Sequence, residues 1–215
     1  MVWKTTRVAA ALLSLVGIGS TASAVVLTNP GFDADDASGA DVSGASGWGM
    51  FNSAFTTNDV SPHSSPNTLK IFGPFFQGGG AGVVQGGFAA SPGEIWSASA
   101  FLRDDTSDAM QGANFAVVKV EFLNAASAVI GAFESPHFTA AAPDNTWVPE
   151  EAIGTAPAGT TTAQIVLVHV QLNTPVTGGS VFFDDAAFGL VPEPTSLAVL
   201  GIGSAALAMR RRRGA

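Results

Sequence analysis

Carboxylate side chains are the main groups in this sequence that could carry out acid–base chemistry, but their spacing does not pair them. Glu150 and Glu151 are adjacent, and neighbouring residues of a strand point to opposite faces. Two such carboxylates cannot share the acid and base roles of glycoside hydrolysis. Asp104, Asp105 and Asp108 surround an expected turn. No acid–base pair is therefore predicted.

The sequence gives equally little support for a histidine metal site or for a catalytic nucleophile. His63, His137 and His169 are far apart in the sequence and lack the spacing of a metal-ligand motif. The chain has no cysteine and no Gly-x-Ser-x-Gly motif. The sequence favours a protein that is not an enzyme.

Two adjacent aromatic residues suggest binding instead. Phe75 and Phe76 are followed by Gln77 and three glycines, and a glycine-rich turn beside two phenylalanines could leave both rings exposed. The alternative is a hairpin loop whose rings tuck onto the core.

The elements that position these residues are predicted to be strands. The chain has 25 glycines and 12 prolines and no sustained helical period, a composition typical of an all-β fold. We expect a jelly-roll β-sandwich of about nine strands, with an N-terminal signal helix and a short C-terminal transmembrane helix. The expected strands are Val25–Thr28, Leu69–Phe72, Ala81–Phe88, Ile95–Arg103, Asn114–Asn124, Ala128–Glu134, Thr146–Ile153, Thr162–Asn173 and Ser180–Phe188.

Alternation predicts which side chains of three strands face the core. The inward sets are Trp96 with Ala98, Ala100 and Leu102, then Ala116 with Val118, Val120 and Phe122, and finally Val166 with Val168, Val170 and Leu172. In the last strand, His169 and Gln171 are then expected to face outward. The polar stretches Asp33–Gly47 and Asn58–Asn67 are expected to be surface loops at one end of the sandwich.

Both ends of the chain look like targeting segments. Residues 1–24 combine Lys4 and Arg7, an apolar core and the small-x-small triplet ending in Ala22 and Ala24. This predicts a signal peptide cut by signal peptidase after Ala24, rather than a membrane anchor. Residues 25–190 then form one domain.

The C-terminal residues 191–215 have three parts in order: Pro192, Glu193 and Pro194, a charge-free run from Ser196 to Met209, and the four arginines 210–213. The run is short for a membrane span, and Arg210, Arg211, Arg212 and Arg213 would hold its end at the cytoplasmic side. The order resembles the PEP-CTERM sorting signal of exported bacterial proteins. That resemblance implies recognition of Pro-Glu-Pro by an exosortase, an inner-membrane anchor before processing, and a surface or extracellular location afterwards. A plain tail anchor is the alternative.

The net charge of the central domain argues against some classes of ligand. Without both end segments, three basic residues (Lys70, Arg103 and Lys119) stand against sixteen acidic ones, a net charge of −13. This argues against nucleic acid and anionic lipid as ligands.

Several short motifs follow one another through the domain: Asn29-Pro30-Gly31-Phe32-Asp33, Gly47-Trp48, Ser91-Pro92-Gly93, Ala156-Pro157-Ala158-Gly159 and Val181-Phe182-Phe183-Asp184-Asp185. Their order resembles the galactose-binding-like jelly-roll domains, especially carbohydrate-binding modules. The resemblance implies a structural Ca²⁺ held by Asp33, the Gly31 carbonyl, and Asp184 or Asp185. Ca²⁺ prefers such hard oxygen ligands. The alternative is that these aspartates only cap turns.

The same resemblance implies sugar binding through exposed aromatic rings. Phe75 and Phe76 are the preferred candidates, with Arg103 and His169 as polar partners. Trp48, Trp96 and Trp147 are expected to be framework or core residues.

Three hypotheses follow. The first is an exported, non-catalytic protein that associates with exopolysaccharide of the cell surface or a biofilm matrix. The second is a purely structural surface protein without a specific sugar ligand. The third is a hydrolase that acts on exopolysaccharide.

Overall fold

The computed structural model describes residues 25–64, 66–172 and 178–192. Both predicted terminal helices lie outside these ranges. Within them the chain is all β, as expected, and no helix is long and apolar enough to cross a membrane. Contacts divide the chain into two units, of which residues 22–191 form the β-domain described below.

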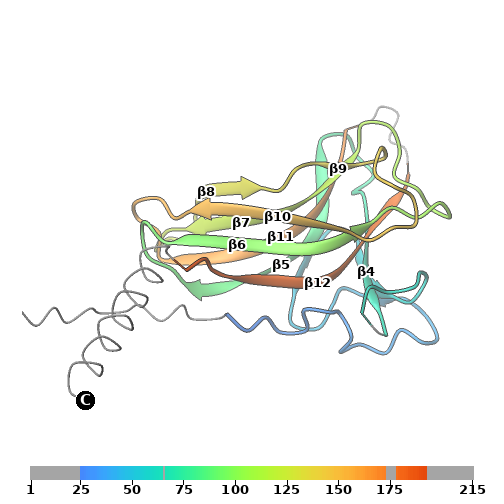
Figure 1. Cartoon of the computed structure of the whole chain (residues 1–215), viewed down its shortest axis with the longest axis horizontal. Coiled ribbons are helices and arrows are strands. Elements are labelled where there is room, and N and C mark those ends of the chain that lie inside the picture. Colours follow the sequence, from blue (N-terminus) through green and yellow to red (C-terminus); the bar gives the residue numbers. More distant parts are fainter. Residues whose placement is uncertain (1–24, 65, 173–177, 193–215) are drawn as a thin grey trace, which may run out of the picture. The chain divides into compact units, whose positions relative to one another are not determined.

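Two antiparallel sheets make up the domain (Figure 1). Sheet A has the order β1–β3–β4–β12–β6–β10, and sheet B has the order β2–β5–β11–β7–β8 with β9 paired to β7. The strands are β1 (Val42–Ser43), β2 (Gly49–Phe51), β3 (Ala54–Thr57), β4 (Thr68–Phe72), β5 (Gly79–Ala89), β6 (Ile95–Arg103), β7 (Phe115–Leu123), β8 (Val129–Glu134), β9 (Phe138–Thr139), β10 (Val148–Thr155), β11 (Thr162–Gln171) and β12 (Ser180–Leu190).

Eight of these strands follow the jelly-roll path. Successive strands from β4 to β7 alternate between the sheets, and β8 pairs with β7 in sheet B. The chain then alternates again through β10, β11 and β12, so that β4–β12–β6–β10 faces β5–β11–β7–β8. Eight of the nine strands expected from the sequence are confirmed. The short strands β1, β2, β3 and β9 were not predicted, because two to four residues carry too little alternation to recognise.

The segment Val25–Thr28 is not a strand, contrary to expectation. The side-chain amide of Gln85 on β5 takes the place of a neighbouring strand there. Its Oε1 accepts from the Thr28 N–H at 2.8 Å, and its Nε2 donates to the Thr28 carbonyl at 2.9 Å. One buried amide thus satisfies the backbone of Thr28 without a β-ladder.

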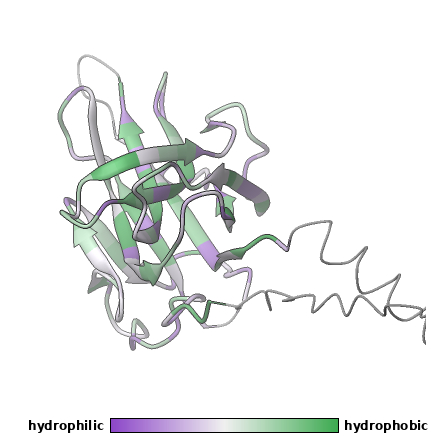
Figure 2. Ribbon diagram, turned by 90° about the vertical axis from the view of Figure 1, so that its left-hand side faces the viewer, coloured by the Kyte–Doolittle hydropathy of each residue, from purple (hydrophilic) through white to green (hydrophobic). Residues whose placement is uncertain are grey.

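The core lies between the sheets. Hydrophobic residues colour much of the strands green, and many loop residues are purple or white (Figure 2). The predicted inward faces of β6 and β7 are confirmed: Trp96, Leu102, Val120 and Phe122 are at most 1% exposed and belong to one core cluster.

The predicted inward face of β11 is wrong. Ile165 and Leu167 belong to the main core, and so the alternating side chains of His169 and Gln171 point inward as well. Val166 and Val168 pack on the other face of sheet B with Val117, in a second cluster that Phe51 and Phe115 partly cover. Because β11 is central in its sheet and buried on both faces, polarity alone could not identify its inner face.

Candidate functional site

Asp184 is the centre of a buried hydrogen-bond cluster at one end of sheet A. Its Oδ2 accepts the backbone N–H groups of His63 and Ser64, both at 2.9 Å. Its Oδ1 accepts the N–H of Asp185 at 2.8 Å. The side chain is 0% exposed, and this burial raises the pKa of Asp184 to about 6. Asp184 therefore fastens the loop that follows β3 onto β12.

Asp185 reaches the side chains of the same two residues, because β12 bulges here. The register with β6 shifts between Asp184 and Ala187, and Asp185 has a positive φ of 47°. Such a bulge re-aims a side chain. Asp185 Oδ2 lies 2.6 Å from His63 Nδ1, and Oδ1 accepts from Ser64 Oγ at 2.7 Å.

His63 in turn belongs to a small aromatic group on the outer face of sheet A. Its ring stacks on Phe101 of β6, with centroids 3.7 Å apart and planes 16° apart. Trp147 lies 6.1 Å away at 73°, and its Nε1 donates to the Ser61 carbonyl at 3.1 Å. Trp147 is thus partly exposed and tied to the loop, rather than being a core residue.

The opening motif lies against the same group and forms a small cradle over Gly31. A Cβ on Gly31 would lie 3.0 Å from Asp33 Oδ2, 3.3 Å from Ser64 Oγ and 3.7 Å from Asp185 Oδ1. The structure therefore brings Gly31, Asp33 and Asp185 together, as predicted, and leaves room among their oxygens that a side chain would fill. Asp184 is not part of this opening, because the three atoms nearest to that Cβ position belong to Asp33, Ser64 and Asp185.

The donor set of this cradle fits a hard cation in part. The two carboxylates and the hydroxyl that surround the Gly31 position are oxygen ligands of the kind that Ca²⁺ prefers. The described residues contain no group of three or more His, Cys, Asp or Glu side chains arranged to hold a metal. A cation here would rely on Asp33, Asp185 and backbone oxygens.

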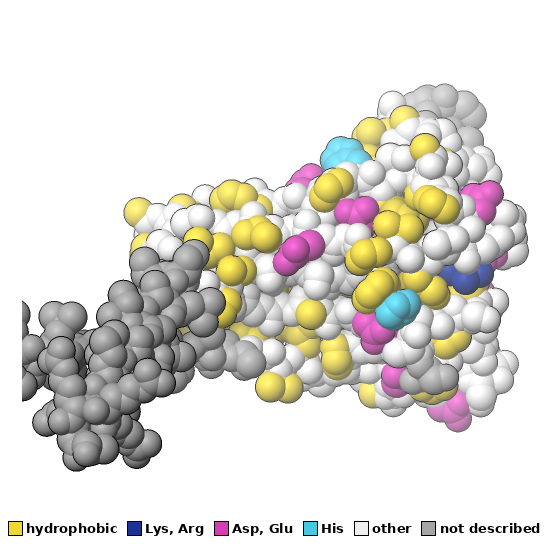
Figure 3. Space-filling view, in the orientation of Figure 1, with side chains coloured by type: hydrophobic (Ala, Val, Ile, Leu, Met, Phe, Trp, Pro, Cys, Tyr) yellow, Lys and Arg dark blue, Asp and Glu magenta, His cyan; other side chains and the backbone are white. Residues whose placement is uncertain are grey.

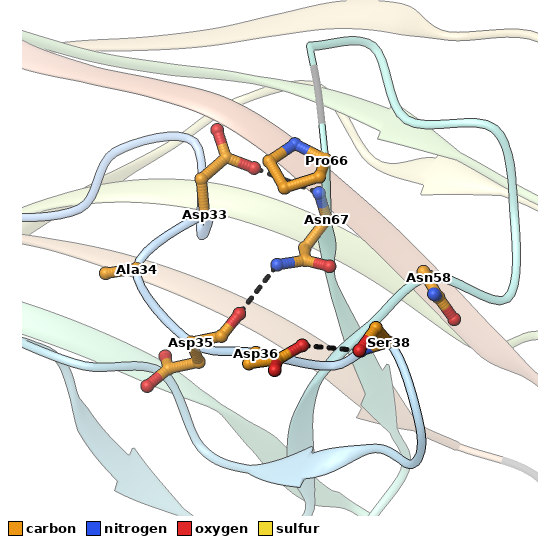
Figure 4. Close-up of a pocket in the computed structure, with 8 residues that line it drawn as sticks. All are labelled: Asp33, Ala34, Asp35, Asp36, Ser38, Asn58, Pro66 and Asn67. Atoms are coloured by element: carbon orange, nitrogen blue, oxygen red, sulfur yellow. Dashed lines mark hydrogen bonds between the residues drawn. The ribbon is translucent and has the colours of Figure 1, made fainter.

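An acidic pocket of roughly 320 Å³ opens beside the cradle (Figure 4). Asn67 links two acidic residues of its lining, because its N–H donates to Asp33 Oδ1 and its Nδ2 donates to the Asp35 carbonyl. The dashed lines in the figure join Asn67 to Asp33 and to the Asp35 carbonyl, and Asp36 to Ser38, so part of the lining is engaged in loop hydrogen bonds. The pocket is lined by Asp33, Ala34, Asp35, Asp36, Ser38, Asn58, Pro66 and Asn67.

Phe75 and Phe76 lie at the turn between β4 and β5, and their predicted exposure is confirmed at 60% and 54%. The turn is held from below by the buried Gln171, whose Oε1 accepts the Phe75 N–H at 2.6 Å. The Phe76 ring lies over Gly79, where a Cβ would collide with it. Two rings are therefore displayed on an ordered turn that is anchored to β11.

The two predicted polar partners do not join this tip. The prediction for His169 is wrong: its side chain is 0% exposed, its Nδ1 lies 3.3 Å from the Ile71 carbonyl, and burial lowers its pKa to about 4. Arg103 instead pairs with Asp105 at 2.7 Å. Burial opposes ionisation of Asp105, but hydrogen bonds from Arg103 and Ser107 outweigh it and lower the pKa of Asp105.

The remaining acidic candidates are not arranged as a catalytic pair. Glu151 is exposed on the outer face of β10, while Glu150 lies on the other side of the strand, where burial raises its pKa. Burial also raises the pKa of Asp104, whose Oδ1 accepts the Met110 N–H at 2.8 Å. Asp104 therefore holds a turn.

Sequence reasoning missed the roles of Ser64, His63 and Gln171. Ser64 and His63 contact Asp184 and Asp185 across about 120 residues of sequence, a separation that leaves no local signal. Gln171 was correctly assigned to a strand but was predicted to face outward, whereas it is buried.

Of the sorting residues, only Pro192 is described, and it is exposed. Ala22, Ala24, Glu193, Pro194 and the arginines 210–213 lie outside the described residues.

Comparisons with known proteins concern the C-terminal segment and the fold of the domain. Residues 190–213 match the PEP-CTERM protein-sorting motif. A search of the curated proteins finds no match to the sequence.

Similar solved structures are β-sandwich domains. They include the Stig cyclase FisC from Fischerella (14% identity, TM-score 0.57, 80% of this chain and 99% of that one). An arabinose-bound GH51 α-L-arabinofuranosidase has 19% identity and a TM-score of 0.56, over 81% of this chain. The CBM22-1 xylan-binding domain of Paenibacillus barcinonensis Xyn10C has 10% identity and a TM-score of 0.51, over 81% and 99% of the two chains. This chain spans only 27% of the arabinofuranosidase. At such identities the likeness establishes a carbohydrate-binding-module-like fold.

Proposed function

We propose that this protein is exported, is processed at its C-terminal PEP-CTERM signal by an exosortase, and works outside the cytoplasm as a non-catalytic glycan-binding protein. The sorting motif supports export and a membrane anchor before processing. The binding role rests on one observation, the two exposed phenylalanines on the anchored β4–β5 turn.

The tip suits a sugar ring better than most other ligands. Aromatic rings stack on the apolar face of a pyranose, and an ordered turn loses little conformational freedom when it binds. Acidic side chains are far more prominent than basic ones on the face drawn in Figure 3, in line with the domain's charge of −13. A neutral glycan is therefore favoured over a polyanionic one.

Affinity electrophoresis in gels loaded with a neutral bacterial exopolysaccharide tests this role. We expect the native domain to be retarded, and Phe75→Ala or Phe76→Ala to abolish most of the retardation. Ile153→Ala is the matched control, because Ile153 is 55% exposed on β10, in the other sheet from β5.

Other outcomes would favour the other two hypotheses. A domain that is not retarded by any glycan would be a purely structural surface protein. Release of reducing sugar that is lost in a single carboxylate variant would instead show a hydrolase.

We also propose that the cradle over Gly31 takes up Ca²⁺, with Asp33 and Asp185 as its carboxylate ligands. A bound Ca²⁺ would neutralise the two carboxylates and link the opening motif to β12. We expect calcium to raise the melting temperature of the native domain. The rise should vanish in a variant with Asp33→Asn and Asp185→Asn and persist in Asp36→Asn, and an unchanged melt after chelation would reject the site.

A further inference from the structure

The last strand and the sorting motif share residues. Strand β12 ends at Leu190, and the Val191 N–H still donates to the Ile95 carbonyl of β6 at 2.8 Å. The motif match begins at Leu190, and Pro192 follows Val191 directly. No unpaired residue separates the β-ladder from the Pro-Glu-Pro segment.

This arrangement restricts access to the segment. Proteolytic enzymes act on chain that has opened locally, because their clefts bind several residues in an extended form. While β12 is paired, the residues that precede Pro192 are hydrogen-bonded within the sheet. The native strand therefore competes with any enzyme that must bind on that side of the segment.

The pairing of β12 shows which part of the strand can open. Its ladder with β4 covers only Ser180–Phe183, and beyond the bulge at Asp184–Ala187 it pairs with β6 alone. The Ala186 N–H is held by the Pro30 carbonyl at 2.9 Å. Residues 187–191 therefore form a separate end of the strand, held by one ladder rather than two.

One buried ring opposes this opening. Phe188 is 6% exposed and packs against Trp96 at 4.9 Å and Phe88 at 5.4 Å. Release of the strand end would expose this ring. Residues 180–186 would stay in place, since Val181 and Phe183 lie in the main core.

We propose that release of residues 187–191 from β6 limits the rate of processing at the Pro-Glu-Pro segment, with Phe188 as the latch. The inference rests on the sorting role proposed above. The folded domain then takes part in its own sorting, because the stability of the pairing between residues 187–191 and β6 sets the rate of processing.

Pulse-chase labelling of the full chain, in a bacterial host that carries an exosortase, tests the inference. A six-residue Gly-Ser insertion between Val191 and Pro192 frees the segment from β12 and keeps its spacing from the residues that follow. We expect processing to become several-fold faster. Phe188→Ala should accelerate processing of the native chain and have no further effect in the chain with the insertion.

Phe122→Ala is the control, because Phe122 is fully buried in β7 of the other sheet. It weakens the domain as a whole but removes neither of the two ring contacts of Phe188. Equal rates with and without the insertion would overturn the proposal, as would equal acceleration by Phe122→Ala. If Phe188→Ala fails to accumulate, the insertion alone decides. If no chain is processed at all, the sorting role itself is refuted, and this inference with it.

Discussion

Replacement of the buried His169 by glutamine should change how the stability of the domain depends on pH. Burial lowers the pKa of His169 from 6.5 to about 4 in the folded protein, and its Nε2 has no hydrogen-bond partner among the described residues. A depressed folded pKa means that the unfolded chain binds the proton more readily. The stability that neutral His169 allows is therefore complete above pH 6.5 and is lost as the pH falls towards 4.

The magnitude follows from the two pKa values. Between pH 7 and pH 4.5, native His169 should cost about 2.5 kcal/mol of folding free energy, at about 1.4 kcal/mol for each pKa unit. Asp108, which favours protonation of His169, is already included in that pKa. Asp184 acts in the opposite direction, because its folded pKa is raised to about 6 and it adds stability as the pH falls. Both proteins contain Asp184, so its contribution cancels when the free energy of unfolding of the native protein is subtracted from that of His169→Gln.

Urea unfolding at pH 7 and pH 4.5 measures that difference. We expect the free energy of unfolding of His169→Gln, relative to the native protein, to be about 2.5 kcal/mol higher at pH 4.5 than at pH 7. Parallel pH profiles for the two proteins would show that His169 titrates normally in the fold, and the account of its burial would then be wrong.

Three further perturbations have definite expected outcomes. Phe183→Ala, in the main core, should destabilise the domain by about 3–5 kcal/mol in urea unfolding. Asp184→Ala leaves the Ser64 N–H without its acceptor and should cost about 1–3 kcal/mol; hydrogen exchange of that amide should rise, and unchanged protection would contradict the role of Asp184. Gly79→Ala should displace the Phe76 ring and weaken glycan retardation, with little change in the far-ultraviolet circular dichroism spectrum.

The fold was largely predictable because most of its strands have a recognisable local sequence pattern. The inward positions of β6 and β7 are all apolar, and polar residues such as Ser97, Lys119 and Glu121 occur only at the intervening positions, so the inner sets were correct. The same reasoning failed for β11, because both of its faces are covered and both carry polar residues. Gln164 donates to Glu121 on the outer face, whereas Gln171 meets the Phe75 backbone and His169 meets that of Ile71 on the inner face. Alternation identifies a strand, but it does not decide which of the two faces of the strand points to the core.

The features of the candidate sites also fall into two groups, those that the sequence predicts and those that only the structure shows. The sequence by itself determined the sorting motif and the acidic charge and singled out the Phe75–Phe76 pair, since each depends on residues that are adjacent in the chain or simply counted. The exposure of the two rings was settled by the structure. Only the tertiary structure decided that His63 and Ser64 meet Asp184 and Asp185, that Asp185 and Asp33 converge over Gly31, and that Val191 is still paired with β6. These contacts join segments far apart in the sequence, and chain crossings and strand bulges, which leave no local pattern, bring them together.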